Sequence, residues 1–225
     1  GRAHGNSGGH RYHAGYDLTV KPTEVSRDYY ERALAEFGDD PRGVNWRDSQ
    51  SQELRFQVLT EVGDLSGRRL HDVGCGLGHL HSWLRQRQPD VDYVGSDISE
   101  KMIAGARARS VDAAEFYVAD ILDDGQQAPW MRADYVINSG VFTVKSTIPE
   151  KQWRTFVHDM ARAMFGVAEK GIAFNLMTSF VDYRDDHLFY EDPDAILDFC
   201  VSELSRKVVI RHDYPLWEYA VYVYK

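Results

Sequence analysis

The apolar residues of this chain fall into short runs that alternate with longer segments of helical periodicity. Runs of four to seven mainly apolar or β-branched positions, bounded by turn residues, are typical of strands, whereas apolar positions repeating every three or four residues indicate amphipathic helices. The predicted strands are 70–73, 92–96, 115–118, 133–138, 171–176, 207–212 and 218–224. The helices predicted between them are 78–87, 99–109, 149–165 and 192–204. This alternation predicts an α/β fold, doubly wound, with helices on both faces of a mostly parallel sheet.

Two more helices are predicted ahead of the first strand, at 26–37 and 49–62. We expect them to cover the mouth of a ligand site. The preceding segment is rich in glycine and histidine and has no hydrophobic period, so we expect a flexible arm or the remnant of an added tag. The expected division of the chain is a tail at 1–16, the cover helices at 17–66 and the main domain at 67–225.

The first predicted strand runs directly into a turn with three alternating glycines, Gly74, Gly76 and Gly78. Glycine allows positive φ and lets a ligand lie against bare backbone. The helix that follows directs its first N–H groups at whatever occupies the turn. Asp72 lies at the strand end, where a bound cation would suit it, and Cys75 lies within the turn. The pattern predicts a small ligand with a cationic or hydroxyl-rich part above this turn.

Acidic residues end three successive strands, namely Asp72, Asp97 and Asp120. Ligands of open α/β sheets lie beyond the carboxyl ends of the strands, so these acids are expected to gather at one site. An acid about 20 residues past a glycine turn suits ribose hydroxyls, because a carboxylate can accept from both at once. Asp97 has that position, and Asp120 is placed to accept from an adenine amine. The ring would lie among three apolar side chains, Ile98, Ile121 and Met102.

Together, the segments 72–78, 97–102 and 119–121 resemble the motifs of the class I (Rossmann-like) S-adenosylmethionine-dependent methyltransferases. The resemblance implies a seven-stranded sheet of order 3-2-1-4-5-7-6 with strand seven antiparallel. It also implies S-adenosylmethionine as cofactor and S-adenosylhomocysteine as product. The glycine turn would hold the methionyl part, Asp97 the ribose, and Asp120 with Ile121 the adenine.

The segment 138–142, which includes Asn138, Ser139 and Gly140, resembles the part of that family that lies under the methionyl group and faces the acceptor. A nicotinamide-binding Rossmann domain is the alternative. Its turn is spaced G-x-G-x-x-G, whereas Gly74, Gly76 and Gly78 are spaced G-x-G-x-G, which favours the methyltransferase.

The acceptor side is less well defined by the sequence. The loop 179–191 is polar and aromatic and longer than a plain connection, which is typical of a functional loop. Within it, His187 is the first candidate for a general base, because its pKa lies near neutrality, and Tyr183 is the second. Trp46, in the loop between the two cover helices, and Gln52 and Arg55, in the second of them, are placed to contribute to the site, and Trp46 and Arg55 would reach the cofactor. The candidate acceptor-binding residues are Phe142, Lys145, Asn175 and Tyr190, and the cations Lys145 and Arg55 would suit an acidic acceptor.

Composition narrows the function further. The formal net charge of −9 argues against broad nucleic-acid binding, which requires a basic surface. Two cysteines fit a reducing, cytoplasmic compartment, no apolar run is long enough to span a membrane, and no metal site is predicted. We expect in-line methyl transfer from S-adenosylmethionine to an O or N atom of a small molecule, by a monomer or homodimer. A protein acceptor, or a non-catalytic scaffold that only binds the cofactor, is the alternative.

Overall fold

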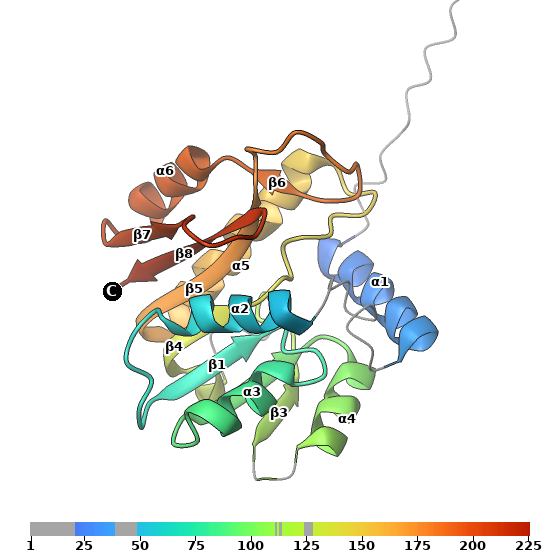
Figure 1. The fold of residues 1–225 in the computed structure, drawn as a ribbon, viewed down its shortest axis with the longest axis vertical. Helices are drawn as coiled ribbons and strands as arrows, with labels where there is room; N and C mark the ends of the chain where they lie inside the picture. The colour runs from blue at the N-terminus through green and yellow to red at the C-terminus, as the bar shows by residue number, and fades with distance from the viewer. Residues whose placement is uncertain (1–20, 39–48, 111, 113, 124–127) are drawn as a thin grey trace, which may run out of the picture.

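The computed structural model describes residues 21–38, 49–110, 112, 114–123 and 128–225. The segment 1–16 and Trp46, for which the sequence analysis made predictions, lie outside the described residues. Figure 1 shows one sheet with helices packed on both of its sides and α1 beside its end.

The seven main strands have the predicted order, and β8 is antiparallel to both of its neighbours, β5 and β7. Along the sheet they are β3 (Glu115–Val118), β2 (Asp92–Asp97), β1 (Arg69–Val73), β4 (Ala133–Asn138), β5 (Ala168–Thr178), β8 (Glu218–Tyr224) and β7 (Val208–Arg211). The prediction of seven strands needs one correction. Part of the segment expected to be a loop forms an eighth strand, β6 (Tyr190–Glu191), which pairs in parallel with the end of β5. The completely buried Phe189 next to it holds this segment against the core.

The two faces of the sheet are covered by different helices. One face packs against α2 (Ser49–Thr60), α3 (His79–Arg87) and α4 (Glu100–Arg109), and the other against α5 (Glu150–Val167) and α6 (Pro193–Glu203). Central strands are apolar on both faces as a result. In β4, Tyr135 and Ile137 belong to the first layer and Val136 to the second. A short 3-10 helix, η3 (Pro129–Met131), precedes β4 and was not predicted.

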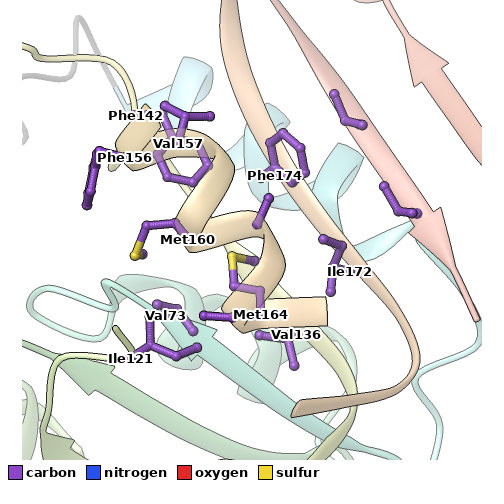
Figure 2. Packing of buried hydrophobic residues seen from close by; sticks show 14 of the residues in the cluster. Val73, Ile121, Val136, Phe142, Phe156, Val157, Met160, Met164, Ile172 and Phe174 are labelled. Carbon is purple, nitrogen blue, oxygen red and sulfur yellow. The ribbon is translucent and has the colours of Figure 1, made fainter. Parts of the chain in front are cut away.

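The α5 side of the core runs along the sheet and reaches the carboxyl ends of the strands, where Val73 ends β1 and Phe142 follows β4 (Figure 2). Met160 and Met164 of α5 pack with Val136 of β4, and the ring of Phe142 meets the ring of Phe174 edge-on at 5.7 Å between centroids. Each of these side chains is at most 5% exposed. Close packing of this kind leaves little freedom for the strand ends above it.

The first helix, α1 (Pro22–Phe37), is attached to the N-terminus of α4. Its Glu31 carboxylate accepts a hydrogen bond from Ser99 Oγ at 2.8 Å and pairs with Lys101 Nζ at 2.7 Å. These contacts, with the hydrogen bond that capping residue Ser99 accepts from the Met102 N–H, hold α1 at the carboxyl end of the sheet. Among the described residues, no helix has the length and apolar character that a membrane crossing requires.

Candidate active site

The glycine turn after β1 is shaped for close approach of a ligand. Gly74, Gly76 and Gly78 all have positive φ, at 76°, 52° and 75°. A Cβ on Gly74 would lie 2.2 Å from Val141 Cγ2, so only glycine lets the turn pass beneath the segment that follows β4. All three glycines were predicted as cofactor-binding residues, and Gly74, Gly76 and Cys75 line a cavity of about 140 Å³ above the turn.

Asp72 presents an unused acceptor to this cavity. Its Oδ2 accepts a 2.7 Å hydrogen bond from the Tyr93 hydroxyl, while Oδ1 is buried and has no partner among the described residues. Burial raises the pKa of the Asp72 carboxyl to about 7. A buried acceptor without a partner is costly, which indicates that a donor or cation belongs here.

Asp97, at the end of β2, joins the glycine turn to the start of α4. Its carboxylate accepts from the Gly76 N–H at 3.0 Å and from the Ser99 N–H at 2.9 Å. Burial raises the pKa of this carboxyl as well. Each carboxylate oxygen has a second lone pair, so Asp97 can still accept from two ligand hydroxyls at the cavity wall.

A second cavity adjoins the first and shares Gly74, Asp97, Ile98 and Val141 with it. Its remaining walls come from α1, α5, the end of β1 and the segment after β3, and include two more predicted residues, Asp120 and Ile121. Met102 lies in the wall of the first cavity. The residues predicted for ribose and adenine are therefore brought together around two adjoining cavities.

The segment after β4 forms the opposite wall. Asn138 Nδ2 donates to the Val73 carbonyl at 2.9 Å, and the Asn138 Oδ1 and Ser139 Oγ atoms are buried without a partner among the described residues. Gly140 has a φ of 84°, and its N–H donates to Asn175 Oδ1 at 2.8 Å. Ser139 and Gly140 line the first cavity, whereas Asn138 braces β4 against β1.

The two N-terminal helices supply the rest of the wall. Tyr30 of α1 and Gln52, Arg55 and Phe56 of α2 line the first cavity. The Tyr30 hydroxyl donates to the Gly140 carbonyl at 3.4 Å, and burial raises the pKa of this tyrosine. The sequence indicates Gln52 and Arg55 as contributors to the site, but it assigns Tyr30 to the apolar face of the first helix and so misses it. The hydroxyl group of Tyr30 was the only signal, and a tyrosine on an apolar helix face usually packs in the core.

The predicted acceptor-binding residues do not line either cavity, and one of them requires a clear correction. Phe142 is completely buried in the α5 layer of the core, where it cannot face an acceptor (Figure 2). Lys145 donates to the Asp186 carbonyl at 2.5 Å, and the Tyr190 hydroxyl accepts from the Asp185 N–H at 3.1 Å. Asn175 lies one layer behind the wall, bonded to Gly140. The residues Thr143 and Val144 line the cavity in their place.

The two predicted catalytic residues are also absent from the walls of both cavities. Tyr183 is 77% exposed, and the His187 ring pairs with Asp185 at 2.5 Å. The reason is the way their loop packs. The Ser146 N–H donates to the His187 carbonyl and the Phe189 N–H to the Thr143 carbonyl, so the loop supports the wall from behind.

These features fit S-adenosylmethionine at the residue level. The molecule carries a ribose, an adenine and an ammonium group, and the site offers Asp97, the Asp120 side of the second cavity, and the unpartnered Asp72 oxygen. No group of three or more His, Cys, Asp or Glu side chains within the described ranges is arranged to hold a metal ion.

Comparison with known proteins agrees with this geometry. The "Methyltransferase domain" family matches residues 71–165. The protein Rv1506c of Mycobacterium tuberculosis, whose name assigns it provisionally to the methyltransferases, is 33% identical over 161 residues, covering 69% of this chain and 92% of that protein. A 23S rRNA (uracil(1939)-C(5))-methyltransferase of Xylella fastidiosa is 30% identical over 165 residues, which is 67% of this chain and 37% of that enzyme.

Solved structures with low sequence identity have the same fold. The magnesium protoporphyrin IX methyltransferase of Synechocystis with bound S-adenosylmethionine has a TM-score of 0.61 at 18% identity, covering 93% of this chain and 99% of that one. Human N-acetylserotonin methyltransferase in complex with S-adenosylmethionine has a TM-score of 0.57 at 16% identity, covering 92% of this chain and 72% of that one.

The fold and the site thus define a Rossmann-like methyltransferase domain. The chain belongs to the class I S-adenosylmethionine-dependent methyltransferase family, and it is an enzyme that uses S-adenosylmethionine as methyl donor.

Proposed function

We propose that this enzyme transfers the methyl group to an O or N atom of a small molecule. The observation that carries the proposal is the cavity enclosed between the glycine turn and the two N-terminal helices. Its walls are mainly apolar with a few polar groups, which is the usual character of small-molecule sites. The apolar part comes from Phe56, Leu77, Leu80, Val141 and Val144.

In this proposal the segment 17–66 covers the site and the segment 67–225 is the methyltransferase domain. The contacts of α1 support such a division, because Tyr30 meets Gly140 and Glu31 meets Ser99, both from the other part of the chain. A cover of this kind excludes water and aligns the two reactants, which supplies most of the acceleration that in-line methyl transfer needs.

Bound S-adenosylmethionine supplies an electrophilic methyl group on a sulfonium sulfur. The chain's own part is to hold and orient. Asp72 would take the ammonium group and Asp97 the ribose hydroxyls, while the polar side chains Tyr30, Gln52 and Thr143 would position the acceptor. The raised pKa of Tyr30 keeps its hydroxyl protonated at neutral pH, so it can donate as well as accept.

A neutral acceptor is favoured over the acidic one first considered. Arg55 was expected to attract a carboxylate, but its Nε and Nη2 atoms bind the two oxygens of Glu218 at 2.6 and 2.7 Å. That pairing neutralises the charge of the guanidinium group inside the site. The Lys145 ammonium group donates a hydrogen bond to the Asp186 carbonyl. We therefore infer a hydroxyl or amine acceptor without a carboxylate beside it.

The comparisons support a small acceptor without identifying it. Magnesium protoporphyrin IX and N-acetylserotonin are the acceptors that the names of two structural neighbours give. One relative is named for ribosomal RNA, yet the net charge of −9 disfavours a polyanionic acceptor for this chain.

The test is a panel of phenols, alcohols, amines and carboxylic acids incubated with the enzyme and S-adenosylmethionine. Formation of S-adenosylhomocysteine is measured by mass spectrometry, with heat-inactivated enzyme as blank. We expect turnover with a neutral hydroxyl or amine compound. Turnover only with the carboxylic acids, or cofactor binding without any turnover, would reject the proposal.

A further inference from the structure

A buried chain of polar contacts runs behind the cavity wall, from α2 to the segment after β4. Arg55 binds Glu218 through both oxygens, and Tyr214 donates its hydroxyl to the same carboxylate at 3.4 Å. Asn175 Nδ2 donates to Glu218 Oε2 at 3.2 Å, and Asn175 Oδ1 accepts from the Gly140 N–H at 2.8 Å. Glu218 is 4% exposed and Asn175 completely buried.

The chemistry of Glu218 determines which way the Asn175 amide points. A carboxylate held by arginine only accepts hydrogen bonds, so Asn175 must turn its NH₂ group toward Glu218. Its oxygen then faces the Gly140 N–H. The two side chains are diagonal neighbours on one face of the sheet, because Asn175 pairs with Ala220, two positions after Glu218. The opposite amide orientation would place two donors together and an oxygen against a carboxylate.

Gly140 is consequently held from two sides. Asn175 fixes its N–H, and its carbonyl accepts from the Tyr30 hydroxyl at 3.4 Å and from the Thr143 N–H at 3.2 Å. Its φ is 84°, a backbone conformation that residues other than glycine rarely adopt. This peptide unit lines the cavity beside Gly74 and Gly76.

We propose that Glu218 is a positioning residue for methyl transfer: through Asn175 it sets the orientation of the Gly140 peptide at the wall that faces the donor methyl group. The inference rests on the proposed function for its place in catalysis. The Glu218 carboxylate does not itself touch the reacting atoms. It lies on β8, which comes later in the chain than all of the cofactor motifs.

The first experiment follows the Gly140 amide, by hydrogen exchange on the whole ¹⁵N-labelled chain saturated with S-adenosylhomocysteine. Glu218→Gln should accelerate exchange at Gly140 by about tenfold or more, because the Asn175 amide loses its fixed orientation. Exchange at Val94 in the centre of β2 should not change. Glu191→Gln is the matched control, since Glu191 is also buried and binds an arginine, Arg154, at 2.6 Å, but does not contact Asn175.

A double-substitution cycle then tests the route. Asn175→Ala should also accelerate Gly140 exchange, and adding Glu218→Gln to it should cause no further change. If Glu218→Gln prevents folding because it removes the negative charge beside Arg55, the variant Arg55→Leu/Glu218→Leu removes both charges and should give the same acceleration. An unchanged Gly140 rate in a folded variant, an equal effect of Glu191→Gln, or an undiminished effect in the Asn175→Ala background would overturn the proposal.

The second experiment compares two cofactor analogues by calorimetry. Sinefungin carries an amine where S-adenosylmethionine carries the transferable methyl group, whereas S-adenosylhomocysteine has nothing there. Glu218→Gln should weaken the binding of sinefungin by about tenfold more than the binding of S-adenosylhomocysteine. An unchanged ratio of the two affinities would contradict a role at the methyl group. Neither experiment needs an acceptor, so their failure is distinct from failure of the acceptor panel.

Discussion

Tyr93 on β2 donates its hydroxyl hydrogen to Asp72 Oδ2 on β1 at 2.7 Å, and the second oxygen of Asp72 stays buried without a partner among the described residues. The pair fixes the carboxylate at the start of the glycine turn. Because burial raises the pKa of Asp72 to about 7, its charge is poised to change when a cation arrives.

Cofactor affinity should therefore depend on pH. If Asp72 pairs with the ammonium group, only the ionised carboxylate binds well, and below about pH 7 affinity for S-adenosylhomocysteine should fall by about tenfold per pH unit. Calorimetry from about pH 5.5 to 8.5 measures this. The Tyr93 bond favours the ionised form, so Tyr93→Phe should move the dependence to higher pH. Asp72→Asn should abolish it, and a wild-type affinity independent of pH would exclude the pairing.

Asp97→Ala should weaken the binding of S-adenosylhomocysteine by about 1–3 kcal/mol, because charge-assisted hydrogen bonds to the ribose would be lost. Asp97 also accepts from the Gly76 and Ser99 N–H groups, so urea unfolding must be measured separately. Asp92→Ala is the control, since that acid lies exposed at the opposite end of the same strand. Equal affinities for the Asp97 and Asp92 variants would refute the assignment.

Gly74→Ala tests the close approach within the turn. The new Cβ would meet Val141 Cγ2 at 2.2 Å, and φ is 76°, so we expect a loss of about 2–4 kcal/mol in unfolding free energy together with weaker cofactor binding. Gly67→Ala is the control. Gly67 has a similar φ of 61°, and a Cβ added there would have no atom within 4 Å, so this substitution measures the conformational cost alone. The contact argument is wrong if the two substitutions cost the same.

The buried histidine His71 should contribute less to the stability of the protein in mild acid. Its ring is buried in β1 between the Met131 carbonyl, at 2.9 Å, and Ser96 Oγ, at 2.8 Å, and burial lowers its pKa to about 4. Since the unfolded chain binds the proton near pH 6.5, the stabilisation is complete above that pH and is lost as pH falls toward 4.

Between about pH 7.5 and pH 5 the contribution of His71 to the free energy of urea unfolding should fall by about 2 kcal/mol. The raised pKa of Asp72 acts in the opposite direction, so the effect of His71 is measured against His71→Gln, which keeps a donor and an acceptor but does not titrate. Relative to this variant, the wild type should lose about 2 kcal/mol over the interval. Parallel pH profiles for the two proteins would show that His71 does not carry the effect.

The fold was predictable to a large extent because its signals are local. The alternation of strand and helix, the glycine turn and the acids at strand ends all lie within short windows. They predicted the bounds of β3, β4 and β8 to the residue. The two-residue β6 escaped prediction, because its pairing with β5 depends on a contact between distant segments.

The acceptor side shows the opposite case. Residue type and loop length made His187 the first candidate for a general base. Its loop, however, forms backbone hydrogen bonds with the segment 143–146 and does not line either cavity. Phe142 follows the cofactor segment directly, yet the register of that segment turns it into the core. No local pattern distinguishes a loop that closes a site from one that supports its wall.

By itself, then, the sequence determined the class of fold and the cofactor, since these depend on backbone geometry and charge at fixed spacing along the chain. Only the tertiary structure decided which side chains surround the rest of the cavity, where we propose that the acceptor binds. Tyr30, Arg55, Asn175 and Glu218 come from four separate elements, and they meet because sheet register and helix packing bring them together. Interactions over such separations leave no periodic trace in the sequence.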